Sequence, residues 1–224
     1  MKVDKLIARN QHEGWFERVT AECAMEYPIH LITDINKDEL VIDAGCNVGG
    51  FVEAFKSRFN KFLSIDASSY NIEQYQSHHH HPTIHKALYS VDGEVVKLRK
   101  YMGDGDNDSN SGNFGITGFV NEGNNHGYRS EEYEEVQTLS LETILKDIEE
   151  VGLLKIDIEG GEYEFLYNKD LSKIKWITGE FHNWLFQFGD RGVELLEWIG
   201  KTHDEVHSDG DGNNSHYVKL YKRK

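Results

Sequence analysis

Charged side chains gather at the ends of two apolar segments in the second half of the sequence. The stretch LLKIDIEGGEYEFL carries Lys155, Asp157 and Glu159, and the stretch IKWITGEFHN carries Glu180 and His182. Residues two positions apart lie on the same side of a β-strand, so the members of each set face one way. Such groups can remove a proton from a substrate or stabilise charge on an oxygen atom. We predict that these five residues form a catalytic site.

A purely structural interpretation of the same residues stays open. Glu159 and Glu162 could favour the N-terminus of a helix, and Lys155 could pair with Asp157 or with Glu180. Buried charges are costly without partners, so ion pairing would account for part of the pattern. It does not explain why lysine, carboxylates and histidine gather beside a glycine-rich turn.

That glycine-rich turn, VIDAGCNVGG, joins an apolar segment to a helical one. Its spacing is D-x-G-x-N-x-G, with Asp43, Gly45, Asn47 and Gly49 at the defined positions. Glycines at such a junction let backbone N–H groups approach a ligand. Asp43 stands where a dinucleotide-binding motif has its first glycine, and a carboxylate repels a pyrophosphate but suits an amino or sulfonium group. The spacing resembles the S-adenosylmethionine site of Rossmann-like methyltransferases, and the alternative is a tight turn that binds nothing.

A further acidic residue, Asp66, ends the next apolar segment, KFLSIDAS. A carboxylate at that place commonly accepts hydrogen bonds from the hydroxyl groups of a ribose. The alternative is a carboxylate that caps the following helix. Together with the glycine-rich turn, Asp66 favours a cofactor that contains a nucleoside.

Three other polar stretches suggest metal binding but do not meet its requirements. Four adjacent histidines at 78–81 cannot share one face, so we interpret them as a solvated loop. The stretches DGDNDS and DGDGNN resemble the start of a calcium loop. Both lack the glycine and the glutamate that such a loop needs further along, so we interpret them as turns.

Apolar segments alternate with amphipathic ones along the chain, and this order predicts an α/β fold with a doubly wound sheet. The expected core strands cover residues 39–45, 61–68, 82–90, 152–159 and 174–183, with further strands at 94–102 and 135–139 and a closing antiparallel pair at 203–209 and 215–222. The expected helices lie within about 1–35 and at 49–59, 69–76, 141–151, 161–167 and 192–200. Residues 103–127, rich in Gly, Asn and Asp, are typical of a lid over a site or of a disordered insertion.

The chain of 224 residues has 24 Lys and Arg residues against 39 Asp and Glu residues, which gives a net charge of −15. Such a surface repels the phosphates of nucleic acids and of anionic membranes. The N-terminal residues show no apolar signal segment, and no apolar run is long enough to cross a bilayer. Cys23 and Cys46 imply no disulfide framework. We therefore expect a single domain over residues 1–224, located in the cytoplasm.

Four stretches, VIDAGCNVGG, ALYSVDG, VQTLSLETIL and LLKIDIEGGEYEFL, resemble the FkbM family of S-adenosylmethionine-dependent methyltransferases over about residues 40–182. The most specific mark is lysine-x-aspartate-x-glutamate-glycine followed by x-glutamate, which residues 155–162 meet. The resemblance implies a class I methyltransferase (Rossmann-like) fold, with a mostly parallel seven-stranded sheet, an antiparallel last strand and helices on both faces. It also implies O-methylation of a sugar or another small hydroxylated acceptor.

The resemblance also assigns residues to the binding of S-adenosylmethionine. The methionine part would lie at the glycine-rich turn, the ribose at the end of the second strand and the adenine edge against the third. The corresponding residues are Asp43, Gly45, Cys46, Asn47, Gly49, Asp66, Ala67, Ala87 and Leu88. The family usually has glutamate and proline where this chain has Asp66 and Ala67, and residues 103–127 match nothing in it.

Methyl transfer from a sulfonium is an in-line displacement, so the enzyme has to position a hydroxyl group and remove its proton. We expect Asp157 or His182 to take that proton. Lys155 would stabilise negative charge on the oxygen, while Glu159 and Glu180 would orient the acceptor.

Three alternatives stay open. Asp157, Glu180 and His182 could hold a magnesium or manganese ion, although we favour a site without metal. An RNA ribose methyltransferase would need a basic surface, which the net charge of −15 opposes. A protein that binds the cofactor without turnover would keep the same motifs. The expected partner is a small molecule or a sugar, and neither a nucleic acid nor a membrane.

Overall fold

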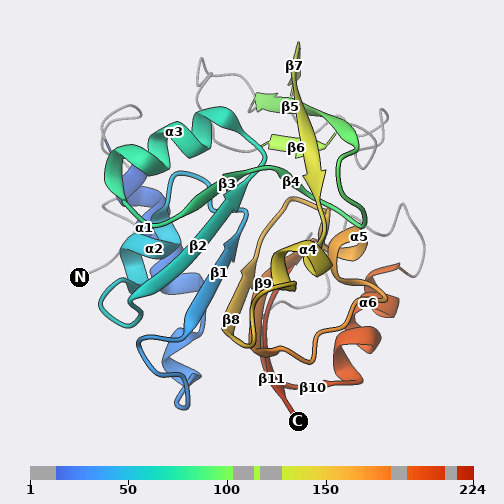
Figure 1. Cartoon of the computed structure of the whole chain (residues 1–224). Coiled ribbons are helices and arrows are strands. Elements are labelled where there is room, and N and C mark those ends of the chain that lie inside the picture. Colours follow the sequence, from blue (N-terminus) through green and yellow to red (C-terminus); the bar gives the residue numbers. More distant parts are fainter. Residues whose placement is uncertain (1–13, 103–113, 117–127, 183–190, 210–215) are drawn as a thin grey trace.

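The computed structural model describes residues 14–102, 114–116, 128–182, 191–209 and 216–224 (Figure 1). Residues 1–13, expected in the N-terminal helices, and most of the expected lid at 103–127 lie outside the described residues. The same holds for the stretch DGDNDS and for all but the first residue of DGDGNN. None of the described helices has the length and apolar character needed to cross a membrane.

A seven-stranded sheet forms the centre of the described structure, in the order β10-β11-β9-β8-β1-β2-β3. Neighbours from β9 through β8, β1 and β2 to β3 pair in parallel, and β11 is antiparallel to both of its neighbours. The strands are β1 Leu40–Ala44, β2 Lys61–Asp66, β3 Thr83–His85, β8 Val151–Ile156, β9 Ile174–His182, β10 His203–Asp209 and β11 His216–Arg223. The predicted α/β sheet with its closing antiparallel strand is confirmed.

Helices cover both faces of this sheet (Figure 1). On one face, apolar side chains such as Phe51 and Tyr75 pack against the sheet from α1, α2, α3 and the 3-10 helix η2. On the other face, α4, α5 and α6 contribute residues such as Phe165 and Ile199. The bounds are α1 Trp15–Glu26, η2 Ile29–Leu31, α2 Gly50–Phe55, α3 Ser69–His78, α4 Leu141–Leu145, α5 Glu162–Leu166 and α6 Arg191–Gly200. The two layers leave the carboxyl ends of the parallel strands as the place for a ligand.

A second, four-stranded sheet lies beyond the carboxyl ends of β1 and β2 (Figure 1). Its order is β4-β7-β5-β6, and its strands are β4 Ala87–Leu88, β5 Val95–Met102, β6 Phe114–Ile116 and β7 Tyr128–Leu139. The single strand expected at 82–90 is therefore wrong, because the chain pairs β3 with β2 and, after Lys86, β4 with β7. Residues 114–116, expected within a lid or an insertion, pair with β5 as a strand. A hydrophobic pattern does not show where a chain changes sheets.

Candidate active site

The turn between β1 and α2 follows a path that glycine allows. Gly45, Asn47 and Gly49 have φ angles of 76°, 49° and 96°, in the left-handed region that most side chains disfavour. A Cβ atom on Gly45 would lie 1.7 Å from the carbonyl oxygen of Asp157. The spacing D-x-G-x-N-x-G thus lets the end of β1 approach the end of β8, and it places the turn beside the charged residues.

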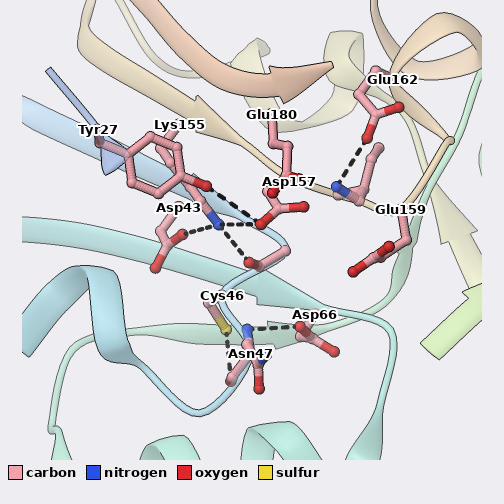
Figure 2. A network of polar contacts seen from close by, with 12 residues as sticks. Tyr27, Asp43, Cys46, Asn47, Asp66, Lys155, Asp157, Glu159, Glu162 and Glu180 are labelled. Atoms are coloured by element: carbon pink, nitrogen blue, oxygen red, sulfur yellow. Dashed lines mark hydrogen bonds and ion pairs between the residues drawn. The ribbon is translucent and has the colours of Figure 1, made fainter. Parts of the chain in front are cut away.

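Lys155 contacts both this turn and the charged residues. Its Nζ donates a hydrogen bond of 2.7 Å to the carbonyl oxygen of Gly45, and it lies 3.3 Å from Oδ1 of Asp43 and 4.0 Å from Oδ2 of Asp157 (Figure 2). Asp43 and Lys155 are 0 % and 3 % exposed, and they are register neighbours on β1 and β8. Burial opposes the charge of the ammonium group, but Asp43 and Asp157 outweigh it and raise the pKa of Lys155. Lys155 is therefore a buried cation whose nearest carboxylate is Asp43.

A cleft that is partly open to solvent lies beside the turn. The residues that line it are Gly45, Asn47, Ile65, Asp66, Ala67, Asn71, Lys86, Ala87, Leu88, Leu98, Asp157, Ile158 and Glu159. We refer to Ile65, Ala87, Leu88 and Leu98 as the apolar wall. Most residues predicted to bind the cofactor are thus brought together, namely Gly45, Asn47, Asp66, Ala67, Ala87 and Leu88.

The other three residues predicted to bind the cofactor do not line the cleft. Asp43 is fully buried beside Lys155. Cys46 is 2 % exposed, and burial raises the pKa of its thiol well above the usual range. Gly49 is buried as well. These three residues are buried in the protein and not on the surface of the cleft. A direct contact between them and the cofactor therefore stays a prediction.

Asp66 lines the cleft and also holds two backbone segments. Its Oδ2 accepts a hydrogen bond of 2.9 Å from the N–H of Asn47, and its Oδ1 accepts bonds of 2.8 Å from the N–H of Ser68 and 3.1 Å from Nδ2 of Asn71. Burial raises the pKa of Asp66 to about 6, although these hydrogen bonds oppose the shift. Asp66 therefore supports the segment that leads into α3, but the residue that caps this helix is Ser68. The oxygens of Asp66 have further lone pairs, and the contact with a ribose stays a prediction.

Carboxylates and an imidazole meet where β8 and β9 end. Nε2 of His182 lies 3.4 Å from Oε2 of Glu159 and 3.8 Å from Oε1 of Glu180. One ligand-type atom from each of Asp157, Glu180 and His182 lies within 4.8 Å of the others. The residues predicted to be catalytic therefore form one cluster, and Lys155 reaches it through Asp157.

Burial and mutual repulsion shift the protonation of this cluster. Burial, and then the charge of Asp157, raises the pKa of Glu180 to about 8. Burial also raises the pKa of Glu159 to about 7, although the charge of His182 opposes the shift. For His182, burial disfavours the charged ring, but the facing carboxylate of Glu162 outweighs it and raises the pKa well above its ordinary value. The facing carboxylates thus favour the charged form of His182, and the pKa values of Glu159 and Glu180 lie near neutral pH.

Glu162 holds the turn between β8 and α5. Its Oε1 accepts hydrogen bonds from the N–H groups of Ile158 (3.1 Å) and Gly160 (3.2 Å) and from Nδ1 of His182 (3.0 Å). Glu159, inside this turn, has a φ angle of 54°, which is uncommon for a residue with a side chain. Backbone strain of this kind is typical of functional sites. The strained turn leaves Glu159 on the lining of the cleft.

Two residues near the cluster come from the N-terminal segment and carry no motif. The hydroxyl of Tyr27, which is 3 % exposed, donates a hydrogen bond of 3.3 Å to Oδ2 of Asp157 (Figure 2). Burial, and then the charge of Asp157, raises the pKa of Glu26 to about 6. An amphipathic pattern predicts the helix but does not show which strand ends it faces. The sequence therefore gives no signal that Tyr27 and Glu26 lie near the cluster.

The residues of the cleft fit S-adenosylmethionine. The apolar wall suits a purine, and the carboxylate of Asp66 suits ribose hydroxyl groups. Asp157 and Glu159 add negative charge, which suits a sulfonium or an ammonium group. The side-chain oxygen of Asn47 is buried and accepts no hydrogen bond from the residues that the structure describes, so it is available to a ligand.

Residues 40–208 match the family model described as the methyltransferase FkbM domain. No curated protein sequence matches the chain. A solved structure of a methyltransferase FkbM from Methylobacillus flagellatus KT is similar, with a TM-score of 0.51 and 12 % identity over 89 % of this chain and 47 % of that chain.

Two further solved structures are similar at lower TM-scores. One is a ribosomal protein L11 methylase from Lactobacillus delbrueckii subsp. bulgaricus, with a TM-score of 0.47 and 10 % identity over 93 % of this chain and 79 % of that chain. The other is a TehB-like SAM-dependent methyltransferase from Corynebacterium glutamicum ATCC 13032 Kitasato, with a TM-score of 0.44 and 11 % identity over 99 % and 93 % of the two chains. The fold predicted for a class I methyltransferase is confirmed. Because the family model spans most of the sequence, the chain belongs to the FkbM family of S-adenosylmethionine-dependent methyltransferases.

Proposed function

We propose that the protein O-methylates a small hydroxylated acceptor, such as a sugar, with S-adenosylmethionine as the methyl donor. The observation that carries the proposal is a cleft suited to the cofactor that adjoins carboxyl groups with pKa values of about 7 for Glu159 and about 8 for Glu180. When bound, the cofactor supplies an electrophilic methyl group. The protein has to place a hydroxyl oxygen in line with that group and to accept its proton.

Glu159 is the residue that we assign as the proton acceptor. It lines the cleft, and a pKa of about 7 matches the requirement for a base near neutral pH. The raised pKa of His182 favours its charged form, which makes it a poor base, so we assign it to the positioning of Glu159, 3.4 Å away. Asp157 also lines the cleft, and its hydrogen bond from Tyr27 suits a carboxylate that orients the acceptor hydroxyl.

Lys155 and Glu180 take supporting roles in this proposal. Lys155 does not line the cleft, and its hydrogen bond goes to the backbone of Gly45. We therefore assign it to the positioning of the turn in place of a contact with the acceptor oxygen. Glu180 lies 3.8 Å from His182 and would help to orient the acceptor beside it.

The charge of the cluster supports an acceptor that is neutral or cationic. The carboxyl groups of Glu26, Asp157 and Glu159 all act on Glu180 through their charges. A phosphate group brought into such a field would be repelled. This supports a small hydroxylated molecule over a nucleic acid, in agreement with the net charge of −15.

A metal-assisted version of the reaction is the second candidate. The ligand-type atoms of Asp157, Glu180 and His182 lie close enough to share one ion. Glu162 accepts a hydrogen bond from Nδ1 of His182, which would orient Nε2 toward such an ion. Magnesium or manganese fits two carboxylates and one imidazole, and it would polarise the acceptor hydroxyl. Turnover that stops in EDTA and returns with manganese would select this version, whereas turnover unaffected by EDTA would exclude it.

An acceptor screen tests the proposal. The protein is incubated with S-adenosylmethionine and with neutral sugars, amino sugars, sugar phosphates or RNA oligonucleotides, and the S-adenosylhomocysteine formed is measured. We expect turnover with acceptors that carry no phosphate. Turnover confined to RNA or to sugar phosphates would contradict the proposal. Saturable cofactor binding without turnover on any acceptor would instead favour a non-catalytic binding protein.

A further inference from the structure

The cofactor turn has three residues in left-handed conformations, and a side chain from a distant element holds each of them. Lys155 donates to the carbonyl oxygen of Gly45, and Asp66 accepts from the N–H of Asn47. The third contact lies at Gly49, whose carbonyl oxygen is 3.1 Å from Nε2 of a histidine in the run at 78–81.

That histidine is His79, and the expectation of a solvated loop is wrong for it. His79 is 7 % exposed, whereas His80 beside it is exposed. His79 follows α3 directly, and its N–H donates to the carbonyl oxygen of Tyr75 at 2.9 Å, which closes the helix. The sequence does not distinguish the four adjacent histidines from one another. Because α3 ends at His78, the side chain of His79 is buried in the protein.

The ring of His79 packs directly against Gly49. A Cβ atom on Gly49 would lie 2.6 Å from Cδ2 and 2.8 Å from Nε2 of His79, and 2.9 Å from Cδ2 of Tyr75. No side chain therefore fits at this position. Because the carbonyl oxygen can only accept, Nε2 of His79 must carry the proton and donate it.

The surroundings of His79 favour the neutral ring with this one proton. Burial lowers the pKa of His79, and the hydrogen bond to Gly49 and the charge of Glu53 oppose the shift only in part. Phe16 of α1 lies with its ring centroid 5.8 Å from that of His79 and stacks on His78 at 3.9 Å. His79 thus connects α1, α3 and the turn, and it does not line the cleft.

We propose that His79 is a positioning residue for the cofactor, because its Nε2–H fixes Gly49 and with it the turn whose Gly45 and Asn47 line the cleft. The inference rests on the proposed binding of S-adenosylmethionine. Without the donor, Gly49 would keep a buried carbonyl oxygen with one partner fewer, and the left-handed turn would be less well fixed. The affinity for the cofactor would therefore fall.

Calorimetric titration with S-adenosylhomocysteine tests this role in three variants. His79→Leu keeps a side chain of moderate volume but removes the donor, and we expect binding weakened by about five- to tenfold, since the carbonyl oxygen of Gly49 then accepts only from the N–H of Glu53. His79→Gln retains a side-chain N–H, so we expect affinity within about threefold of the wild type. His80→Leu is the matched control, and we expect it to bind like the wild type.

Thermal unfolding of the same variants separates positioning from general stability. A folded His79→Leu variant with wild-type affinity would overturn the inference, and so would equal losses of affinity in His79→Leu and His79→Gln. Should His79→Leu fail to fold, nitrogen-15 NMR of the His79 imidazole in the wild-type protein tests the positioning role instead. We expect exchange of the Nε2 proton with solvent to slow when S-adenosylhomocysteine binds, and an unchanged rate would contradict the role. A wild-type protein that binds no S-adenosylhomocysteine would refute the proposed function itself.

Discussion

The substitution Lys155→Met tests whether this lysine is a structural cation. It keeps a long side chain but removes the charge, which leaves Asp43 fully buried without its cation at 3.3 Å. Removing one partner of a buried ion pair costs about 3–5 kcal/mol. The carbonyl oxygen of Gly45 also loses its donor, which adds about 1 kcal/mol. We therefore expect the free energy of unfolding to fall by about 4 kcal/mol or more.

A double variant provides the control for this prediction. In Lys155→Met/Asp43→Asn neither partner is charged, and replacing both members of a buried pair often costs little. We expect this variant to regain most of the lost free energy of unfolding. The assay is urea unfolding followed by tryptophan fluorescence and circular dichroism, with extrapolation to zero urea.

The pH dependence of the loss gives an independent check. Burial raises the pKa of Asp43 in the folded protein, and Lys155 opposes the shift, so the folded pKa rises further when Lys155 is removed. A carboxyl group whose folded pKa exceeds its unfolded value contributes stability as the pH falls through the folded pKa. The difference between wild type and Lys155→Met should therefore shrink as the pH falls. A variant as stable as the wild type, or a loss that does not change with pH, would refute the reasoning.

Three further substitutions separate roles within the cluster. Glu159→Gln should lower kcat by about 10²–10⁴-fold, a larger effect than any change in the affinity for S-adenosylhomocysteine, and a wild-type rate would remove Glu159 from the role of base. Tyr27→Phe removes the hydroxyl that donates to Asp157, so kcat/KM for the acceptor should fall by about five- to tenfold, whereas the exposed Tyr70→Phe should leave it unchanged. Because the folded pKa of His182 is raised, its stabilising contribution is complete below the unfolded pKa of about 6.5 and is lost as the pH rises through the folded value. Urea unfolding of His182→Gln should therefore show a deficit that shrinks as the pH rises, and a deficit that grows would contradict the raised pKa.

Local signals account for the part of the site that the sequence predicts. A left-handed backbone demands glycine or asparagine at fixed places, so Gly45, Asn47 and Gly49 are recognisable before any tertiary contact is known. The order of apolar segments likewise predicts the parallel strands, and Asp157 and Glu180 follow as residues near their carboxyl ends.

Long-range packing decides the part that the sequence does not predict. Asp43 and Lys155 are neighbours because β1 pairs with β8, and local periodicity does not fix that register. Tyr27 reaches Asp157 because α1 and η2 pack beside the strand ends, which no motif records. His79 differs from its neighbouring histidines through the place where α3 ends. In each case the chemistry of the side chain is visible in the sequence but its partner is not.

Calorimetric titration of the wild-type protein with S-adenosylhomocysteine, S-adenosylmethionine and NAD tests the central claim most directly. We predict saturable binding of both sulfur compounds at one site per chain and no binding of NAD, since the turn carries Asp43 in place of a pyrophosphate-binding glycine. Folded protein that binds neither sulfur compound, or that binds NAD in their place, would contradict the assignment of the cleft to S-adenosylmethionine.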